Sequence, residues 1–203
     1  MKDFGLVVIG AHFGVWLKEE ITKFEDQNIL LVEPVPYNYE ILKKNFSKFR
    51  NISVCTNAIF SKNKKEKFFF VKGSSIPKLG KHWASGIGSF KKQHILDHRS
   101  KRFKIEEEDI EEIIIEFIDF ETLIKKFKIR KINRLQIDVE GAEFEILNSI
   151  NFKNIDIKSI LFESKHFDGT FKEGPKLELI KKKLISDGYK LSEIDKENIL
   201  AEK

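Results

Sequence analysis

Short apolar runs that end in a glycine or an acid, each followed by a segment with helical spacing, constrain the fold of this chain most strongly. The first run covers Gly5–Ile9 and leads into Gly10, and the second covers Asn28–Glu33 and ends in an acid. Arg134–Val139 and Ser159–Glu163 repeat the pattern. Continuous apolar runs of this length are typical of parallel strands that are buried on both faces. Their alternation with helices predicts an α/β fold with helices on both faces of a sheet and right-handed crossovers.

Helical spacing fills the intervals between these runs. Apolar residues recur at intervals that predict helices at 14–25, 39–49, 119–127 and 177–187, with a further helix beginning at 140. Asp119 is a suitable N-cap for the third helix, and Gly188 suits the end of the last. Additional strands are expected at 52–55, followed by 57–59, and at 68–71, with a charged turn at 62–67. Regular structure is expected to resume at 113–117. Residues 189–192 and 198–201 are expected to form an antiparallel pair.

Composition narrows the class of protein. With 203 residues, of which 41% are hydrophobic, the chain is expected to form one domain over residues 1–203 with a substantial core. The single cysteine, Cys55, excludes a disulfide framework and a cysteine-rich zinc site. No apolar run approaches the roughly 20 residues that span a bilayer, and the first residues lack the features of a signal peptide. We therefore expect a cytoplasmic protein without a membrane span.

Residues 73–104 differ from the rest because they lack a clear period and are interrupted by glycine and proline. A stretch of this kind is usually functional, and glycine hinges suit a lid, so we expect an inserted lid or substrate loop. Its basic end, 91–104, leaves open a nucleic-acid-binding protein or an enzyme that acts on RNA. The acids at 106–112 offset that charge, and the net charge is only +5, so nucleic acid is the less favoured partner.

The clearest chemical motif is the turn after the first run, Val7–Gly14. Glycine lets the backbone turn tightly and approach a ligand, and the following helix offers free N–H groups. Glu33 ends the next run, 23 positions after Gly10, where a carboxylate accepts hydrogen bonds from both ribose hydroxyls of a nucleoside. His12 and Val15 stand where the dinucleotide fingerprint needs glycine, and no Gly-Lys-Ser/Thr follows for a P-loop. The looser glycine turn of S-adenosylmethionine sites remains.

A second motif is the acid-rich stretch Leu135–Glu143. Asp138 comes at the end of a predicted strand, and an acid in that place faces the crevice where open α/β sheets bind ligands. Glu140 and Glu143 also fit the first turn of a helix, where the helix dipole stabilises acids. Because that explanation does not account for Asp138, we interpret Asp138 as a site residue.

These motifs, in this order, resemble the FkbM family of S-adenosylmethionine-dependent methyltransferases. The segments that carry the resemblance span most of the chain: Gly10–Gly14, Val32–Asn38, Asn57–Ile59, Trp83–Phe90 and Ile137–Glu143, followed by Glu163, His166 and Gly188–Tyr189. The resemblance implies a class I methyltransferase fold, a Rossmann-like three-layer sandwich whose mostly parallel, seven-stranded sheet has an antiparallel edge strand. It also implies methyl transfer from S-adenosylmethionine, usually to a hydroxyl oxygen of a sugar or other small metabolite.

By position, the resemblance implies a set of cofactor-binding residues: Gly10, Ala11, His12, Gly14, Glu33, Pro34, Asn57, Ala58 and Asp138. The glycine turn would line the methionine part of the cofactor, Glu33 would hold the ribose, and Asn57 and Ala58 would border the adenine. Val8 departs from the family pattern, which has Asp two residues before the first glycine. The basic stretch 91–104 leaves open an RNA-directed methyltransferase, and the departure at Val8 leaves open a third possibility, a methyltransferase-like scaffold without activity.

Transfer to a hydroxyl requires an acceptor oxygen held close to the methyl group and a base within hydrogen-bond reach. The candidate catalytic residues are Asp138, Glu140 and His166, and the candidate substrate contacts are Ser85, Ser89, Glu163 and His166. We expect a small-molecule substrate. We expect no metal, because the spacing of the histidines within 82–98 matches no zinc pattern. The identity of the acceptor and the oligomeric state stay open.

Overall fold

Seven strands build the central sheet of the computed structural model, which describes the chain except for residues 81, 101–103, 140, 166 and 168–173. From one edge to the other they are β10 (Lys190–Glu193), β11 (Asn198–Glu202), β9 (Asp156–Glu163), β8 (Ile129–Ile137), β1 (Lys2–Ile9), β2 (Asn28–Val32) and β3 (Ile52–Cys55). Within the described sheet, β11 alone runs antiparallel to its neighbours, one place in from the edge. The mostly parallel sheet confirms the predicted class I methyltransferase fold.

Parallel pairing aligns the carboxyl ends of the three central strands. Ile9 at the end of β1 pairs with Val32 of β2 on one side and with Ile137 of β8 on the other. The residues that follow in the chain therefore emerge side by side at one edge of the sheet: Gly10, Glu33 and Asp138. This is the edge at which open α/β sheets bind ligands.

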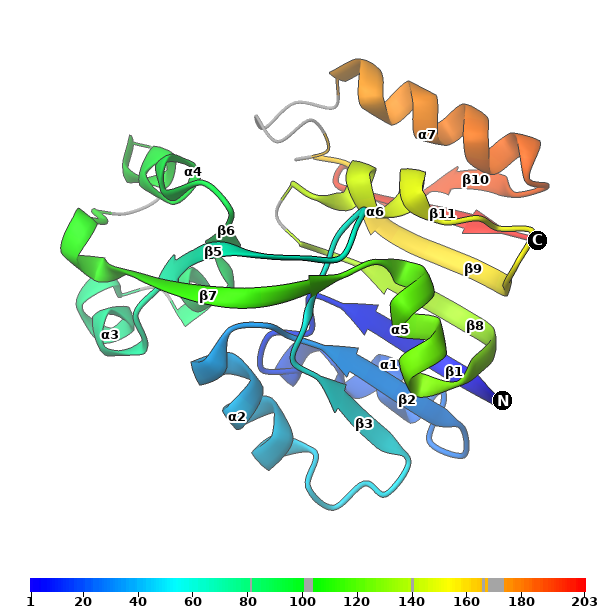
Figure 1. Ribbon diagram of the computed structural model, residues 1–203, viewed down its shortest axis with the longest axis horizontal. Coiled ribbons are helices and arrows are strands. Elements are labelled where there is room, and N and C mark those ends of the chain that lie inside the picture. The colour runs from blue at the N-terminus through cyan, green and yellow to red at the C-terminus, as the bar shows by residue number, and fades with distance from the viewer. Residues whose placement is uncertain (81, 101–103, 140, 166, 168–173) are drawn as a thin grey trace.

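Helices cover both faces of the sheet, because successive side chains of a strand point to opposite sides. Leu6 and Val8 of β1 belong to one buried cluster, and Val7 and Ile9 belong to another. The helices are α1 (Lys18–Thr22) and α2 (Pro36–Asn45) on the first face and α5 (Phe120–Phe127), α6 (Glu143–Ser149) and α7 (Gly174–Ser186) on the second (Figure 1). No helix in the described part of the chain is long and apolar enough to cross a bilayer.

The ends of three helices follow from local sequence. Asp119 caps α5 by accepting a hydrogen bond from the Thr122 N–H at 2.7 Å, as predicted. Helix α2 begins at Pro36, before the predicted start, because proline suits the first turn of a helix, where its missing N–H costs no hydrogen bond. The helix predicted at 14–25 is shorter, since a 3-10 turn at Val15–Leu17 precedes the five-residue α1.

A second sheet, absent from the sequence-based expectations, lies beyond the carboxyl ends of the central strands (Figure 1). Its strands in order are β4 (Ala58–Ile59), β7 (Ile110–Ile118), β5 (Lys64–Val71) and β6 (Gly88–Ser89). The charged turn predicted at 62–67 is wrong, because β5 already begins at Lys64. The charges of this strand face solvent beside acids of β7, and Lys67 pairs with Glu112 at 2.8 Å.

The described part of residues 73–104 is folded beside this second sheet. It contains α3 (Ile76–Leu79), α4 (Lys92–Leu96) and 3-10 turns at Gly73–Ser75, His82–Gly86 and Asp97–Ser100. Leu79, Ala84, Ile87 and Ile95 are buried in one cluster with Val71 of β5. Elements this short escape prediction because they are shorter than the window in which a helical period shows.

Candidate functional site

A cavity of about 360 Å³ lies between the carboxyl ends of the central strands and the second sheet. Several predicted site residues line it: Gly10, His12, Glu33, Pro34, Ala58, Ser89 and Asp138. Other described residues from the prediction are not part of the lining: Ala11, Gly14, Asn57, Ser85 and Glu163. Glu140 and His166 lie outside the described residues. The structure thus brings both chemical motifs and part of the 73–104 segment to one cavity.

Gly10 occupies a position that only glycine fits. Its φ angle is +91°, and a Cβ atom built there would overlap the carbonyl oxygen of Asp138. The N–H groups of Gly10 and Ala11 both donate to the Val32 carbonyl, at 3.0 and 2.9 Å, and the Asp138 N–H donates to Ile9 at 3.0 Å. The glycine turn is therefore held against the end of β8 by backbone contacts, with its surface open to the cavity.

Gly14 serves packing and does not reach the cavity. Its φ angle is +69°, and a Cβ atom there would overlap the ring of Phe46 and the side chain of Leu42. Ala11 is fully buried in the same cluster. These two residues let α2 approach the glycine turn closely, so they shape the site from behind.

Val8 stands where the family pattern has an acid, and its side chain is buried in the core. It is fully buried with Leu17, Leu31 and Leu42, on the face of the sheet covered by α1 and α2. An unpaired carboxylate in this apolar cluster would be costly. The backbone hydrogen bonds to Val32 hold the glycine turn in this chain.

Glu33 presents a buried carboxylate at the end of β2. It is 5% exposed and accepts hydrogen bonds from the N–H groups of His12 and Val35, at 2.9 and 3.0 Å, and from the Asn38 amide at 3.3 Å. Burial raises its pKa to about 7, against the opposing effect of these three donors. A carboxylate accepts about four hydrogen bonds, so capacity remains for a ligand hydroxyl. The group therefore fits the ribose of a nucleoside cofactor.

A closed ring of hydrogen bonds connects this carboxylate to the 73–104 segment. Asn38 donates to the Ser85 carbonyl at 2.8 Å as well as to Glu33. The Ser85 hydroxyl lies 2.6 Å from Nε2 of the His12 ring, and the backbone N–H of His12 donates to Glu33. Ser85 is thus a positioning residue that fixes its segment over the glycine turn, while Ser89 lines the cavity.

Asp138 lines the cavity at the end of β8. Its side chain is exposed at the cavity. Partial desolvation by the neighbouring protein atoms, together with the negative charge of Glu197, raises its pKa. A carboxylate with a raised pKa is a better proton acceptor near neutral pH.

Two further acids lie next to Asp138. One carboxylate oxygen from each of Asp138, Glu143 and Glu163 lies within 4.8 Å of the others, and in the described part of the chain this is the one group of such side chains close enough to share a cation. Glu143 is fully buried, and the N–H groups of Val139 and Gly141 donate to its two oxygens at 2.8 and 2.9 Å. Glu143 therefore holds the loop after β8 in shape beside Asp138.

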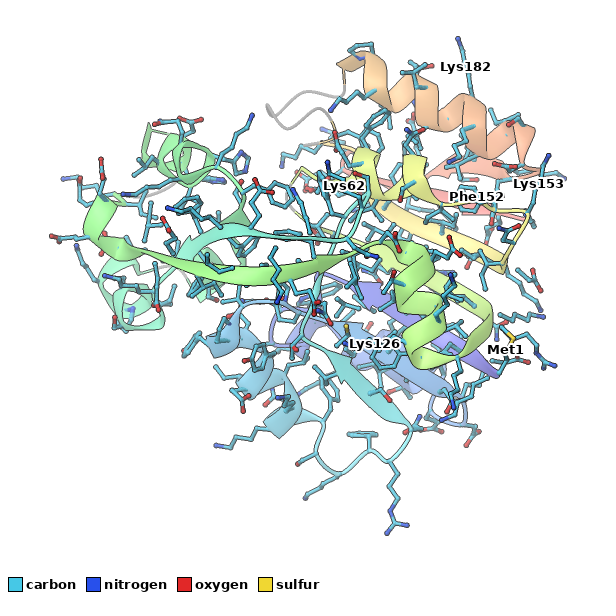
Figure 2. All side chains as sticks on the ribbon, in the orientation of Figure 1. Met1, Lys62, Lys126, Phe152, Lys153 and Lys182 are labelled. Carbon is cyan, nitrogen blue, oxygen red and sulfur yellow. The ribbon has the colours of Figure 1, made fainter. Side chains whose placement is uncertain are left out.

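Asn57 is engaged in contacts outside the cavity. Its amide donates to the Glu116 carboxylate of β7 at 3.0 Å and accepts from Lys126 of α5 at 2.5 Å. Lys126 is labelled in Figure 2. Asn57 thus ties the start of the second sheet to α5, and its neighbour Ala58 is the residue that lines the cavity.

Four phenylalanines form one wall of the cavity, here named the aromatic wall: Phe60, Phe68, Phe90 and Phe117. Neighbouring rings within it lie 4.8 to 6.3 Å apart between centroids, mostly edge to face. The Lys64 ammonium lies 4.3 Å from the centroid of Phe60 and 5.0 Å from those of Phe90 and Phe117. None of the four was predicted as a site residue, although 19 phenylalanines in the chain signal an unusual aromatic content.

Charged side chains at the cavity were also missed by sequence reasoning. Lys91, His94, Glu145 and Lys176 all line it, and Lys176 pairs with Glu145 at 2.8 Å. Single charges on short helices and turns are frequent on any protein surface, so nothing in their local sequence distinguishes them.

Comparison with known proteins identifies a family. Residues 9–191 match the family described as methyltransferase FkbM domain. This match covers more than half of the chain and includes every predicted site residue. No curated protein matches the sequence.

Several solved structures are similar to this chain at low identity. Precorrin-6y C5,15-methyltransferase from Geobacter metallireducens has 13% identity and a TM-score of 0.47, with 100% of this chain and 82% of that chain covered. The Streptococcus mutans protein SMU.1697c, in complex with SAH, has 7% identity and a TM-score of 0.49, with 100% and 91% covered. Aeropyrum pernix fibrillarin, with natively bound S-adenosyl-L-methionine, has 13% identity and a TM-score of 0.46, with 98% and 66% covered. Likenesses this distant add no argument to the family match.

Proposed function

Because the chain belongs to the FkbM family of S-adenosylmethionine-dependent methyltransferases, we propose that it methylates a hydroxyl oxygen of a sugar or other small metabolite. The observation that carries the proposal is the row of Gly10, Glu33 and Asp138 at the ends of three adjacent strands, all lining one cavity. This row combines a backbone turn that accepts close approach, a carboxylate suited to ribose and a second carboxylate suited to proton transfer.

The proposed cofactor site follows the order of the strands. Gly10, supported from behind by Ala11 and Gly14, holds the methionine part together with His12. Glu33 holds the ribose, and the adenine lies against Pro34 and Ala58, which Asn57 positions. When bound, S-adenosylmethionine supplies a sulfonium methyl group that passes to the acceptor oxygen with loss of a neutral thioether.

Asp138 is proposed as the base that takes the proton from the acceptor hydroxyl. Its place in the lining and its raised pKa support this role. Glu140 and His166 stay second candidates for catalysis, with Glu163 as a substrate contact beside Asp138. Proton transfer to a carboxylate at this position leaves the acceptor oxygen free to form its new bond to carbon.

The remaining parts of the chain are proposed to serve the same reaction within one domain, residues 1–203. The 73–104 segment would cover the site and contact the substrate through Ser89, with Ser85 fixing its position. Lys92 in this segment pairs with Glu107 at 2.7 Å, so part of the basic charge of 91–104 is neutralised within the chain.

Calorimetry with S-adenosylhomocysteine tests the cofactor assignment. We expect the full chain to bind this product, Glu33→Gln to bind it more weakly, and Glu19→Gln, exposed on α1, to bind it like the wild type. Absence of binding at every concentration would contradict the proposal and favour an inactive scaffold.

Turnover tests the role of Asp138. With a panel of sugars and small hydroxyl metabolites, release of S-adenosylhomocysteine should fall about 100-fold in Asp138→Asn at saturating cofactor. Unchanged turnover in this variant would show that another group accepts the proton.

A further inference from the structure

We propose that the aromatic wall is the acceptor subsite and that it selects a methyl acceptor with a flat, apolar portion, such as a phenol, over a bare sugar. The inference rests on the proposed function, because it names the acceptor class for the same cavity. It is drawn from the chemistry of the lining, from the position of the wall in the fold and from the contacts that keep its rings in place.

The chemistry of the wall suits an aromatic ligand. Phe60, Phe68, Phe90 and Phe117 all belong to the cavity lining, and Phe60 and Phe90 are the more exposed of the four. A sugar placed against them would lose water from its hydroxyl groups without gaining hydrogen bonds, which is costly. A flat aromatic ring loses no such partners and gains edge and face contacts with the phenyl groups.

Of the polar residues in the same lining, Ser89 and Lys91 lie beside the rings. Ser89 and Lys91 flank Phe90 in the chain, and His94 follows on α4. An acceptor with an apolar body and one or two polar substituents fits this arrangement, with its body on the rings and its substituents toward Ser89 or Lys91. The hydroxyl to be methylated then points toward Asp138, which lines the same cavity.

The wall stands at the junction of the two sheets. Phe60 and Phe90 pack against both the main core of the central sheet and the cluster under the second sheet. The main core contains Ile137 and Ala142, which flank the Asp138 loop. The rings therefore extend from the second sheet toward the end of β8, where the proton acceptor lies.

The rings are held in a fixed arrangement before any ligand arrives. Phe68 and Phe117 are buried on neighbouring strands, and Phe68 packs so closely on Gly88 that a Cβ atom there would come within 2.5 Å of its ring. Lys64 lies over the rings of Phe60, Phe90 and Phe117. A preformed surface of this kind binds a rigid ring with little further loss of conformational freedom.

Binding to the full chain loaded with S-adenosylhomocysteine tests the inference. The probes are phenol, 4-hydroxybenzoate and methyl glucoside, and saturation-transfer NMR or calorimetry measures their binding. We expect the two phenols to bind and methyl glucoside to bind more weakly or not at all. Tighter binding of the glucoside, or no binding of either phenol, would overturn the inference.

The variant Phe90→Leu separates the acceptor from the cofactor. Phe90 is half-buried, so replacing its ring by leucine keeps an apolar side chain in place and does not open the core. We expect phenol binding to weaken about fivefold, with the affinity for S-adenosylhomocysteine unchanged. Phe49→Leu, 44% exposed and outside the cavity lining, is the matched control and should change neither.

Two results of this variant have distinct meanings. If Phe90→Leu weakens the binding of S-adenosylhomocysteine and leaves phenol binding intact, the rings hold the adenine. The inference is then wrong, while the proposed function stands. If the wild type fails to bind S-adenosylhomocysteine at all, the proposed function itself fails. Calorimetry of the unliganded chain distinguishes these results before any acceptor is added.

Discussion

Nε2 of His12 lies 2.6 Å from the hydroxyl oxygen of Ser85, and this contact joins the glycine turn to a segment 73 positions further along the chain. The ring of His12 also stacks on Phe13, with 3.8 Å between the centroids. Since the His12 N–H donates to Glu33, one residue couples the proposed ribose carboxylate to the segment proposed to cover the site.

Removal of the Ser85 hydroxyl should loosen this coupling. In Ser85→Ala we expect the free energy of unfolding to fall by about 1 kcal/mol, the usual contribution of one hydrogen bond. Affinity for S-adenosylhomocysteine should also fall, because His12 loses its orientation. Urea unfolding and calorimetry measure the two effects. Ser47→Ala, whose hydroxyl bonds to an exposed carbonyl on the far end of α2, should leave the cofactor affinity unchanged.

Gly10→Ala should abolish cofactor binding and destabilise the fold. The new methyl group would collide with the Asp138 carbonyl in a backbone region that costs about 1–2 kcal/mol for any other residue. The matched control is Gly188→Ala, which has the same φ of +91° and no atom within 4 Å of a built Cβ. It should show the backbone cost alone, by urea unfolding, and normal cofactor binding. Equal losses in both variants would contradict the clash.

Ligand affinity should rise with pH through about 7, because the ionised Glu33 carboxylate keeps one acceptor position for a ribose hydroxyl. The probe is 5′-methylthioadenosine, which keeps the ribose and lacks the amino-acid part. Calorimetry between pH 6 and 8 should show tighter binding at the higher pH, as expected when a single group with a pKa of about 7 ionises. Glu33→Gln should bind more weakly and lose this dependence, which assigns the titration to Glu33. A pH profile that persists in this variant would assign it to another group.

The same raised pKa predicts how stability depends on pH. The native state binds the Glu33 proton more tightly than the unfolded state, whose pKa is near the usual 4.5. The contribution of Glu33 to stability is therefore present at low pH and is lost as the pH rises from 4.5 to about 7. Urea unfolding of the wild type and Glu33→Gln across this range should show a difference that changes with pH in this direction.

Glu143→Gln should destabilise the loop beside Asp138. Both oxygens of Glu143 accept backbone N–H groups, and the amide can accept only one of the two, so a buried donor loses its partner. The expected cost is about 1–3 kcal/mol in the free energy of unfolding. Glu19→Gln, exposed on α1, should have no effect in the same urea unfolding experiment.

The central sheet could be predicted because its strands are continuous apolar runs, and their pairing places Gly10, Glu33 and Asp138 together. The second sheet could not be predicted from local patterns. Its strands β4 and β6 are two residues long, and β5 begins among lysines that resemble a surface turn.

The aromatic wall could not be predicted from the sequence for a related reason. Phe60, Phe90 and Phe117 are far apart in the sequence, and each looks like an ordinary core residue in its own segment. Pairing of β4 with β7, of β7 with β5 and of β5 with β6 brings them together. Asn57 shows the converse case, since a motif residue in the expected place is engaged by Glu116 and Lys126 outside the cavity.

The second sheet has one property that concerns the evolution and engineering of specificity. All four of its strands come from the continuous stretch 58–118, and the chain enters it through β4 and leaves it through β7. These two strands are hydrogen-bonded neighbours, with Ala58 opposite Phe117 and Ile59 opposite Ile118. The stretch between them forms a loop with adjacent ends, so it can be lengthened or replaced without displacing β3 or α5. Grafting this stretch between relatives, with Ala58 and Ser85 kept because they serve the proposed cofactor site, is therefore a route to new acceptors.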